Sequence, residues 1–137
     1  MSKFGISQPV RRVEDVRFVT GTGQFTDDMR LEGQAYGYVL RSSLAHARIR
    51  SIDLETARAA PGVIDIIIGV ELEEGGVNHL PCACPMTNRD GTERADPKRP
   101  ILCVDKVRYV GDNVAFIVAE TPSQARDAAE LVEVDYD

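Results

Sequence analysis

Apolar and polar side chains alternate in several short segments of this chain, and a period of two residues is typical of a β-strand with one buried face. Tyr36, Tyr38 and Leu40 fall on one such face. The segment 63–68 is instead rich in β-branched residues, which predicts a buried strand. Strands are therefore expected over residues 34–41, 47–52, 63–68, 104–110, 113–119 and 132–136.

The clearest helix signal begins at Thr121, whose hydroxyl can cap the free N–H groups of a first turn. Pro122 suits the first helical position, and Gln124 can reach back to complete a capping box. A shorter helix is expected from Asp53, as N-cap, to Ala60, where a Pro-Gly pair ends it. The longer helix should pack closely against a sheet through its small apolar face: Ala125, Ala128, Ala129 and Val132.

Two stretches, 47–68 and 113–136, share the order strand, helix, strand. A helix that connects two strands favours parallel placement with a right-handed crossover. Gly111-Asp112 resembles a tight turn, which predicts a hairpin between the flanking strands. The expected fold class is therefore α+β (mixed α/β), with antiparallel hairpins added to parallel units.

We expect residues 1–137 to form a single domain in which residues 1–15 are a charged, extended lead-in. The segment 71–100 holds four prolines and little periodicity, which predicts a long loop. Because such loops often carry function, a stand-alone binding module that uses this loop is one interpretation. The last strand runs into Asp137 without a closing turn, so we expect the domain to be the N-terminal part of a larger subunit, cut or split there.

The composition is that of a folded protein, with 43% apolar and 28% charged residues. A net charge of −6 repels phosphate backbones, so no nucleic-acid partner is expected. No apolar run approaches the roughly 18 residues of a membrane span. The first residues also lack the apolar core of a signal peptide, so we expect a cytoplasmic protein.

Three cysteines are an odd number, which favours free thiols in a reducing compartment. A zinc site built from His79, Cys82, Cys84 and Cys103 can be drawn, because zinc takes four such ligands. The alternative, which we favour, is a loop with small, partly buried thiols.

Other chemical patterns are incomplete. Gly21-x-Gly23 lacks the third glycine of a dinucleotide-binding turn, since position 26 is Thr26. Ser42, Ser43 and His46 could meet as nucleophile and base only on a helix, and their segment is predicted as strand and turn, so His46 is interpreted as a structural hydrogen-bonding residue. The acidic groups, which we interpret as solvated, are Asp27, Asp28, Glu71, Glu73 and Glu74.

Lys106 gives an alternative of another class. It precedes an alternating strand, and carrier domains present a lysine for lipoyl or biotinyl attachment at a turn between strands. The flanking pattern is common, so a prosthetic-group carrier is kept as a competing hypothesis only.

Four segments together resemble one family, in order along the chain. The chain is similar to the molybdopterin-binding large subunits of the xanthine dehydrogenase, aldehyde oxidase and carbon monoxide dehydrogenase family. The segments are 13–28 (VEDVRFVTGTGQFTDD), 40–49 (LRSSLAHARI), 107–115 (VRYVGDNVA) and 125–136 (ARDAAELVEVDY).

This resemblance implies an α/β hammerhead domain at the N-terminus of such a subunit. The complete enzymes oxidise an aldehyde, an N-heterocycle or carbon monoxide at molybdenum, and pass electrons through iron–sulfur clusters to FAD in partner subunits or domains. No catalytic, cofactor-binding or metal-ligating residue is carried over to this chain, because the family's motifs for them lie further along the subunit. The charged stretch 11–17 is the expected contact with the rest of the subunit or with those partners.

Overall fold

A computed structural model of the chain describes residues 11–77, 79–81, 84 and 86–137. The contacts within it divide the chain into two units, one ending at Gln34 and the other covering Ala35–Asp137. We call these the N-terminal unit and the larger unit. Each is described by itself.

The larger unit contains six strands and three helices among its described residues. In chain order they are β1 (Tyr36–Arg41), β2 (Ala47–Asp53), α2 (Glu55–Arg58), β3 (Val63–Ile68), α3 (Gly69–Glu74), β4 (Lys106–Val107), β5 (Asn113–Ala119), α4 (Pro122–Glu130) and β6 (Glu133–Tyr136). The expected strands at 34–41, 47–52, 63–68 and 113–119 are confirmed to within a residue or two at each end.

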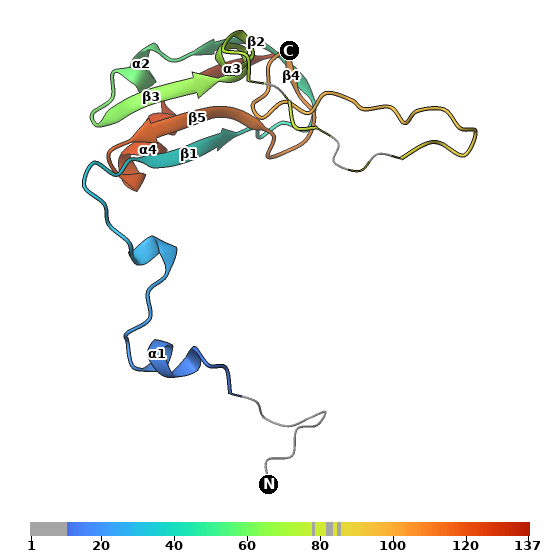
Figure 1. Cartoon of the computed structure of the whole chain (residues 1–137). Coiled ribbons are helices and arrows are strands. Elements are labelled where there is room, and N and C mark those ends of the chain that lie inside the picture. Colours follow the sequence, from blue (N-terminus) through green and yellow to red (C-terminus); the bar gives the residue numbers. More distant parts are fainter. Residues whose placement is uncertain (1–10, 78, 82–83, 85) are drawn as a thin grey trace. The chain divides into compact units, whose positions relative to one another are not determined.

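The strands form two small sheets, in the orders β1-β5-β3 and β4-β2-β6 (Figure 1). Every strand pairing in the described part of the chain is antiparallel, so the expected parallel placement is wrong. The reason is that each connecting helix moves the chain from one sheet to the other. Helix α2 leads from β2 to β3, and α4 leads from β5 to β6, so neither helix joins strands of the same sheet.

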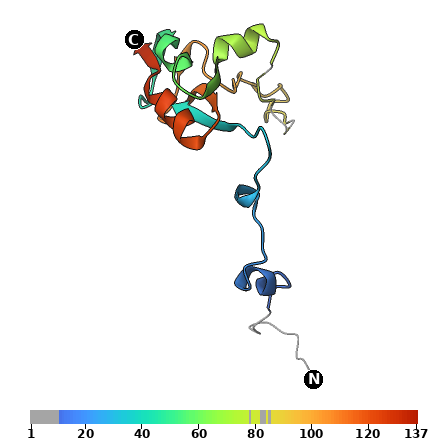
Figure 2. The ribbon, with the colours of Figure 1, turned by 90° about the vertical axis from the view of Figure 1, so that its left-hand side faces the viewer.

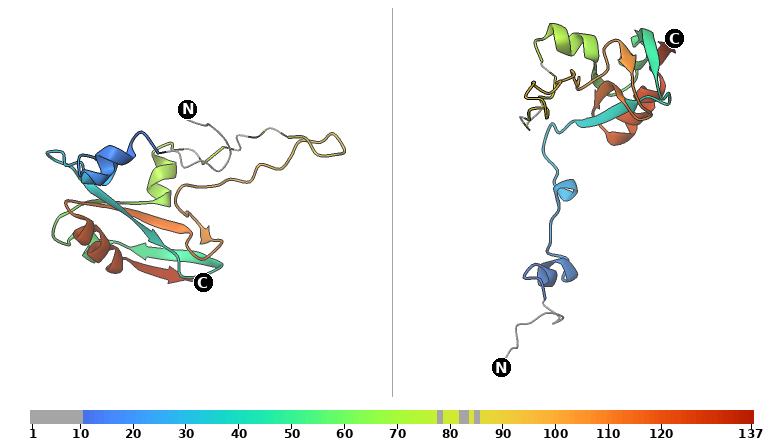
Figure 3. Two further views of the ribbon diagram at one scale, coloured as in Figure 1. Left: turned by 90° about the horizontal axis from the view of Figure 1, so that it is seen from below. Right: turned by 90° about the vertical axis from the view of Figure 1, so that its right-hand side faces the viewer.

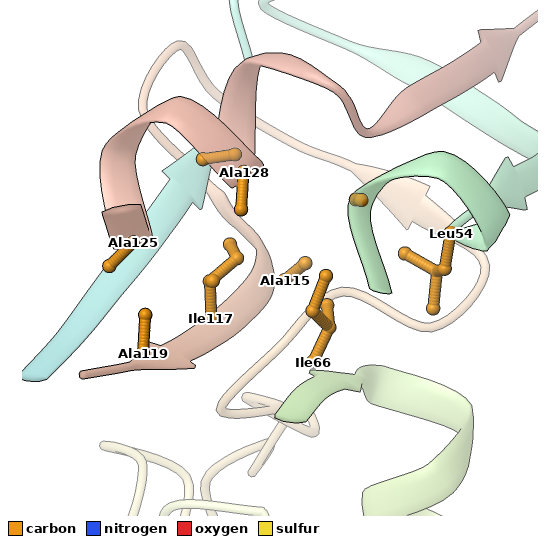
Figure 4. Close-up of a cluster of buried hydrophobic side chains, with 9 residues drawn as sticks. Leu54, Ile66, Ala115, Ile117, Ala119, Ala125 and Ala128 are labelled. Atoms are coloured by element: carbon orange, nitrogen blue, oxygen red, sulfur yellow. The ribbon is translucent and has the colours of Figure 1, made fainter. Parts of the chain in front are cut away.

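Strand β5 is the centre of the first sheet and the most buried strand. Ala115, Ile117 and Ala119 on it are fully buried, because β1 and β3 flank it and α4 covers it (Figures 1 and 2). The alanines of α4 are confirmed as the packing face, with Ala125 and Ala128 fully buried above this strand (Figure 4). Small side chains on both surfaces let the helix approach the sheet closely.

A second core cluster joins the two sheets, with Val107 of β4 and Val114 of β5 both fully buried in it. Leu40 and Ile52 are half-buried and pack against both clusters. The two sheets of the larger unit therefore share one continuous apolar interior, as expected for a domain of this length.

Helix α4 begins as the sequence predicts. The Thr121 hydroxyl oxygen accepts from the N–H of Gln124 at 3.2 Å, and Pro122 is the first helical residue. The Gln124 side chain reaches back to the Thr121 hydroxyl at 2.8 Å, where the sequence predicted a bond to the backbone. Asp53 also acts at the start of α2, where its carboxylate accepts from the N–H of Glu55 at 2.9 Å, although Leu54 holds the N-cap position.

One expectation for the second half of the chain is wrong. The segment 104–110 does not form a hairpin with β5, because β4 contains only Lys106–Val107 and pairs with β2 in the other sheet. The predicted loop 71–100 begins with the helical turn of α3, which extends to Glu74. From residue 86 to 100 the chain forms a long excursion (Figure 3, left), with one isolated bridge between Thr87 and Glu93.

The described part of the N-terminal unit has one helix, α1 (Asp15–Val19), and one 3-10 turn, η1 (Thr26–Asp28). The extended lead-in therefore ends at Glu14, and its first ten residues lie outside the described ones. Thr20, Gly21 and Thr22 form the turn after α1, as the glycines predict, and Gly21 has a φ of 74°.

Truncation of two nearby residues of β3 should change the free energy of unfolding by very different amounts. Ile66 is fully buried and Ile64 is 59% exposed. We expect Ile66→Ala to lower the free energy of unfolding by about 2–5 kcal/mol through lost burial and a cavity. The matched control Ile64→Ala should change it by less than about 0.5 kcal/mol. Urea unfolding followed by circular dichroism measures both, and equal effects would contradict this assignment of the core.

Candidate functional site

Two of the family-like segments meet at one turn. Segment 40–49 and segment 107–115 are far apart in sequence, but Ser42 and the turn before β5 exchange two backbone hydrogen bonds. The Ser42 N–H donates to the Asp112 carbonyl at 2.9 Å, and the Gly111 N–H donates to the Ser42 carbonyl at 2.8 Å. We call this turn, residues 108–113, the Asp112 turn.

Arg41 holds the outer side of the Asp112 turn. Its guanidinium donates to the Gly111 carbonyl at 2.9 Å and to the Asn113 side-chain oxygen at 2.8 Å. Asn113 in turn donates from its amide nitrogen to the Ile101 carbonyl at 3.2 Å. Its backbone carbonyl accepts from the N–H of Cys103 at 2.7 Å. These hydrogen bonds hold together the end of β1, the start of β5 and the segment 101–103.

The carboxylate of Asp112 lies at the centre and is 9% exposed. Its two oxygens accept from the N–H groups of Arg108 at 2.9 Å and of Asn113 at 3.2 Å. The Cys103 thiol and the Tyr109 hydroxyl also donate to this carboxylate. A buried carboxylate needs such donors, because leaving it without them carries a large desolvation cost.

Both side-chain donors have shifted pKa values. Burial, with the hydrogen bond and negative charge of Asp112, raises the pKa of Cys103 from 9.0 to about 12. The hydrogen bond to Asp112, followed by its charge, raises the pKa of Tyr109 above its usual value of 10.0. Both groups therefore carry their protons near neutral pH, which suits them to hold a structure together and not to act as nucleophiles.

Ser42 and His46 have different surroundings in the structure. The Ser42 hydroxyl is buried and bonds only within its own loop, donating to the Leu44 carbonyl at 3.1 Å and accepting from the Leu44 N–H at 3.0 Å. His46 is exposed, and the described contacts give its imidazole no hydrogen-bond partner. Ser42 therefore has the structural role that the sequence assigned to His46.

The described residues give no support to a zinc site built from His79, Cys82, Cys84 and Cys103. Among the described residues there is no group of three histidine, cysteine or acidic side chains that could hold a metal ion. Cys103 is a buried, protonated thiol, whereas a metal ligand must be a thiolate. Cys84 is exposed and forms no disulfide, and Cys82 lies outside the described residues.

A cleft of about 590 Å³ lies beside the Asp112 turn, between α3 and the chain at 98–108. A Cβ atom on Gly69 would overlap the carbonyl oxygens of Leu102 and Cys103, so glycine lets the start of α3 lie against this segment. The rim carries both signs of charge, with Arg108 bonded to Asp105 at 3.3 Å. The walls are formed by Gly69, Leu72, Glu73, Gly76, Val77, His79, Lys98, Pro100, Ile101, Leu102, Val104, Asp105 and Arg108.

The remaining candidates are structural or lie apart from this site. Glu71 accepts from Arg58 at 2.6 Å and from the Ile68 N–H at 3.0 Å. Burial alone would raise the pKa of Glu71, but these bonds and the charge of Arg58 lower it overall. Asp28 accepts from the Phe25 N–H at 2.9 Å and so closes the turn η1.

Lys106 is half-buried inside β4 and pairs with Arg48 of β2. It is not displayed at the tip of a hairpin, which is the geometry that an attachment site requires. The structure therefore gives the carrier hypothesis no support.

Sequence reasoning missed the residues that build the site. Gly111-Asp112 was interpreted as the turn of a hairpin, and Arg41 was assigned no role. The available signal was an acidic residue directly before an apolar strand, together with an arginine at the end of another strand. Only contacts across about seventy residues reveal that these two belong together.

The fold and this turn define a mixed α/β domain with a turn built around a buried carboxylate. The chain belongs to the family described as the aldehyde oxidase and xanthine dehydrogenase a/b hammerhead domain, whose model matches residues 20–137. The resemblance inferred from the four sequence segments is thereby confirmed, as is the mixed helix and sheet class.

Relatives in this family are large oxidoreductase subunits. The chain is 39% identical to the carbon monoxide dehydrogenase large chain of Afipia carboxidovorans, over 93% of this chain and 14% of that protein. It is 40% identical to the 6-hydroxypseudooxynicotine dehydrogenase complex subunit gamma of Paenarthrobacter nicotinovorans, over 96% of this chain and 16% of that one. The chain therefore spans about one sixth of the length of these relatives.

Solved structures agree. The crystal structure of quinoline 2-oxidoreductase from Pseudomonas putida 86 matches with a TM-score of 0.82 and 35% identity, over 99% of this chain and 16% of that one. The reconstituted carbon monoxide dehydrogenase from Oligotropha carboxidovorans matches with a TM-score of 0.79 and 38% identity, over 97% and 15%. In each of these matches the domain corresponds to a small part of the matched protein.

Replacing the central carboxylate tests the Asp112 turn. Asp112→Asn turns one acceptor oxygen into a donor that faces other donors, so we expect unfolding to become easier by about 1–3 kcal/mol. The pKa of Tyr109 should fall towards 10.0. The chain has no Trp, so absorbance of ionised tyrosine reports this directly, with Tyr109→Phe to assign it. Asp105→Asn removes the same charge from an exposed position and should leave both quantities nearly unchanged.

The shifted pKa of Cys103 predicts its reactivity and a pH dependence. At pH 8 fewer than about one in a thousand of these thiols is a thiolate, so a disulfide reagent should modify Cys103 only after unfolding. A variant with the other two cysteines replaced by serine isolates the signal. The folded pKa is the higher one, so stability should fall as pH rises from about 9 towards 12. Equal modification rates in folded and unfolded chains would contradict the assignment.

Proposed function

We propose that this chain is the structural N-terminal domain of the large subunit of a molybdenum-dependent oxidoreductase and performs no catalysis by itself. The observation that carries the proposal is the family match over residues 20–137, together with a site whose acidic and thiol groups are all used in holding the turn. The complete enzyme would oxidise an aldehyde, an N-heterocycle or carbon monoxide.

The described residues include no group of three histidine, cysteine or acidic side chains that could hold a metal ion, and the buried thiol of Cys103 is protonated. We propose no catalytic, cofactor-binding or metal-ligating residue in this chain, as the family resemblance implies. Molybdopterin would belong to the remainder of the subunit, and iron–sulfur clusters and FAD to partner subunits or domains. One relative, from Eubacterium barkeri, is called the nicotinate dehydrogenase large molybdopterin subunit.

The Asp112 turn supports a contact role for this domain. It presents Tyr109 and Val110, which are 57% and 66% exposed, on a backbone fixed by several hydrogen bonds. Exposed apolar side chains on a rigid turn favour contact with another protein surface. The remainder of the large subunit is the proposed partner, and the iron–sulfur and flavin subunits or domains are further ones.

The compartment proposed for the chain is the cytoplasm. Cys103 is a buried thiol that forms no disulfide, which is typical of a reducing environment. No helix among the described residues is long and apolar enough to cross a membrane.

Production of this chain alone and together with the remaining length of the large subunit tests the proposal. The chain alone should contain no pterin, measured by fluorescence after oxidation, and should not reduce dyes with aldehydes, N-heterocycles or carbon monoxide. Together with the rest of the subunit it should copurify in an assembly that contains pterin. Pterin bound by the chain alone, or no association at all, would overturn the proposal.

A further inference from the structure

The N-terminal unit exposes apolar side chains that it cannot bury itself. None of its described residues, 11–34, is buried. A segment of this length is too short to enclose a core of its own. The large apolar side chains left in solvent are Val13, Val16, Val19, Phe25, Met29 and Leu31, between 56% and 96% exposed.

Local contacts nevertheless give this unit a defined conformation. The Arg17 carbonyl accepts from the N–H groups of Thr22 and Gly23, both at 2.9 Å, and from the Thr22 hydroxyl at 3.1 Å. The Thr20 hydroxyl donates to the Val16 carbonyl at 2.7 Å. These bonds fold the chain back directly after α1 and order it before any partner is present, which lowers the entropy cost of binding.

The two aromatic rings of the unit occupy the inner side of this fold. Phe18 stacks on Phe25 with 4.9 Å between ring centroids, and the Arg17 guanidinium lies 5.2 Å from the Phe18 ring. A Cβ atom on Gly23 would overlap the Phe18 ring, so the glycine lets the turn close over it. Val16 and Val19 are three residues apart on α1 and therefore share a different face, which is left open.

We propose that the N-terminal unit is a docking segment, and that Val16 and Val19 bind an apolar surface on the polypeptide that forms the rest of the large subunit. This inference rests on the proposed function and deepens it by naming the contact. The contact with the rest of the subunit was expected at the charged residues of 11–17. The proposal assigns it to the apolar side chains of Val16 and Val19 instead.

Coverage of the relatives supports this occupant. The matches to the Paenarthrobacter subunit and to quinoline 2-oxidoreductase cover 96% and 99% of this chain, so both include most of the N-terminal unit. In both proteins about five sixths of the chain lies outside the match. That length offers the unit a surface within the same subunit.

A second copy of this chain is the weaker alternative. A stable dimer needs roughly 20–30 residues on each side. Residues 11–34 number only 24, so almost the whole described segment would have to lie in such an interface. A segment that is covalently joined to an anchored domain needs far less area, because the tether supplies a high effective concentration.

Hydrogen–deuterium exchange in the assembled large subunit tests the inference. Amides of 11–34 should exchange at least about ten times more slowly in the assembly than in this chain alone, as ordered backbone does. Val16→Asp should abolish that protection while the larger unit keeps its own. Ile64→Asp is the matched control, since it adds the same charge at an apolar residue with 59% exposure, against 67% for Val16. It should leave the protection of 11–34 unchanged.

Three results would overturn the inference. They are equal protection of 11–34 in the chain alone, protection that appears only as the concentration of the chain rises, and full protection in the Val16→Asp assembly. Equal protection in the chain alone would mean that the apolar face binds the larger unit. Protection that depends on concentration would mean that it binds another copy of the chain. In each case an intact assembly would leave the proposed function standing, whereas a chain that never assembles would remove the proposed function itself.

Discussion

Close packing of an alanine-rich helix on the central strand β5 is the constraint on which the larger unit depends. The helix α4 lies against this strand through its small side chains: Ala125 and Ala128 pack in one buried cluster with Ala115, Ile117 and Ala119 of β5. Strand β5 is thereby covered on one face and flanked at both edges. Helix α4 leads the chain from β5 to the second sheet. The turn before β5 holds the Asp112 carboxylate.

The Asp112 turn shows how a buried charge can serve structure without serving catalysis. A carboxylate with so little exposure is tolerated only because backbone N–H groups and two side-chain donors satisfy it. The same bonds keep Cys103 and Tyr109 protonated, which removes the reactivity that the sequence left open. What the turn offers to the outside is a fixed backbone and the exposed pair Tyr109 and Val110. A domain of this kind contributes shape and contact surface to a larger enzyme.

The N-terminal unit follows a different physical logic from the larger one. Its order comes from hydrogen bonds between residues at most about six apart and from one aromatic stack. Such contacts fix a local shape but do not bury apolar surface. The described part of this unit therefore has no buried core, whereas the larger unit carries its own.

Local patterns determined much of this protein. Alternation and β-branching located the strands, Thr121 and Pro122 located the start of α4, and four segments together indicated the family. Tertiary structure alone decided which strands pair, because antiparallel pairing across two sheets depends on contacts between distant residues. It also decided the site: no local pattern links Arg41 with the Asp112 turn, and their roles arise from hydrogen bonds that span about seventy positions. Periodicity records which face of a segment is buried, but not which other segment buries it.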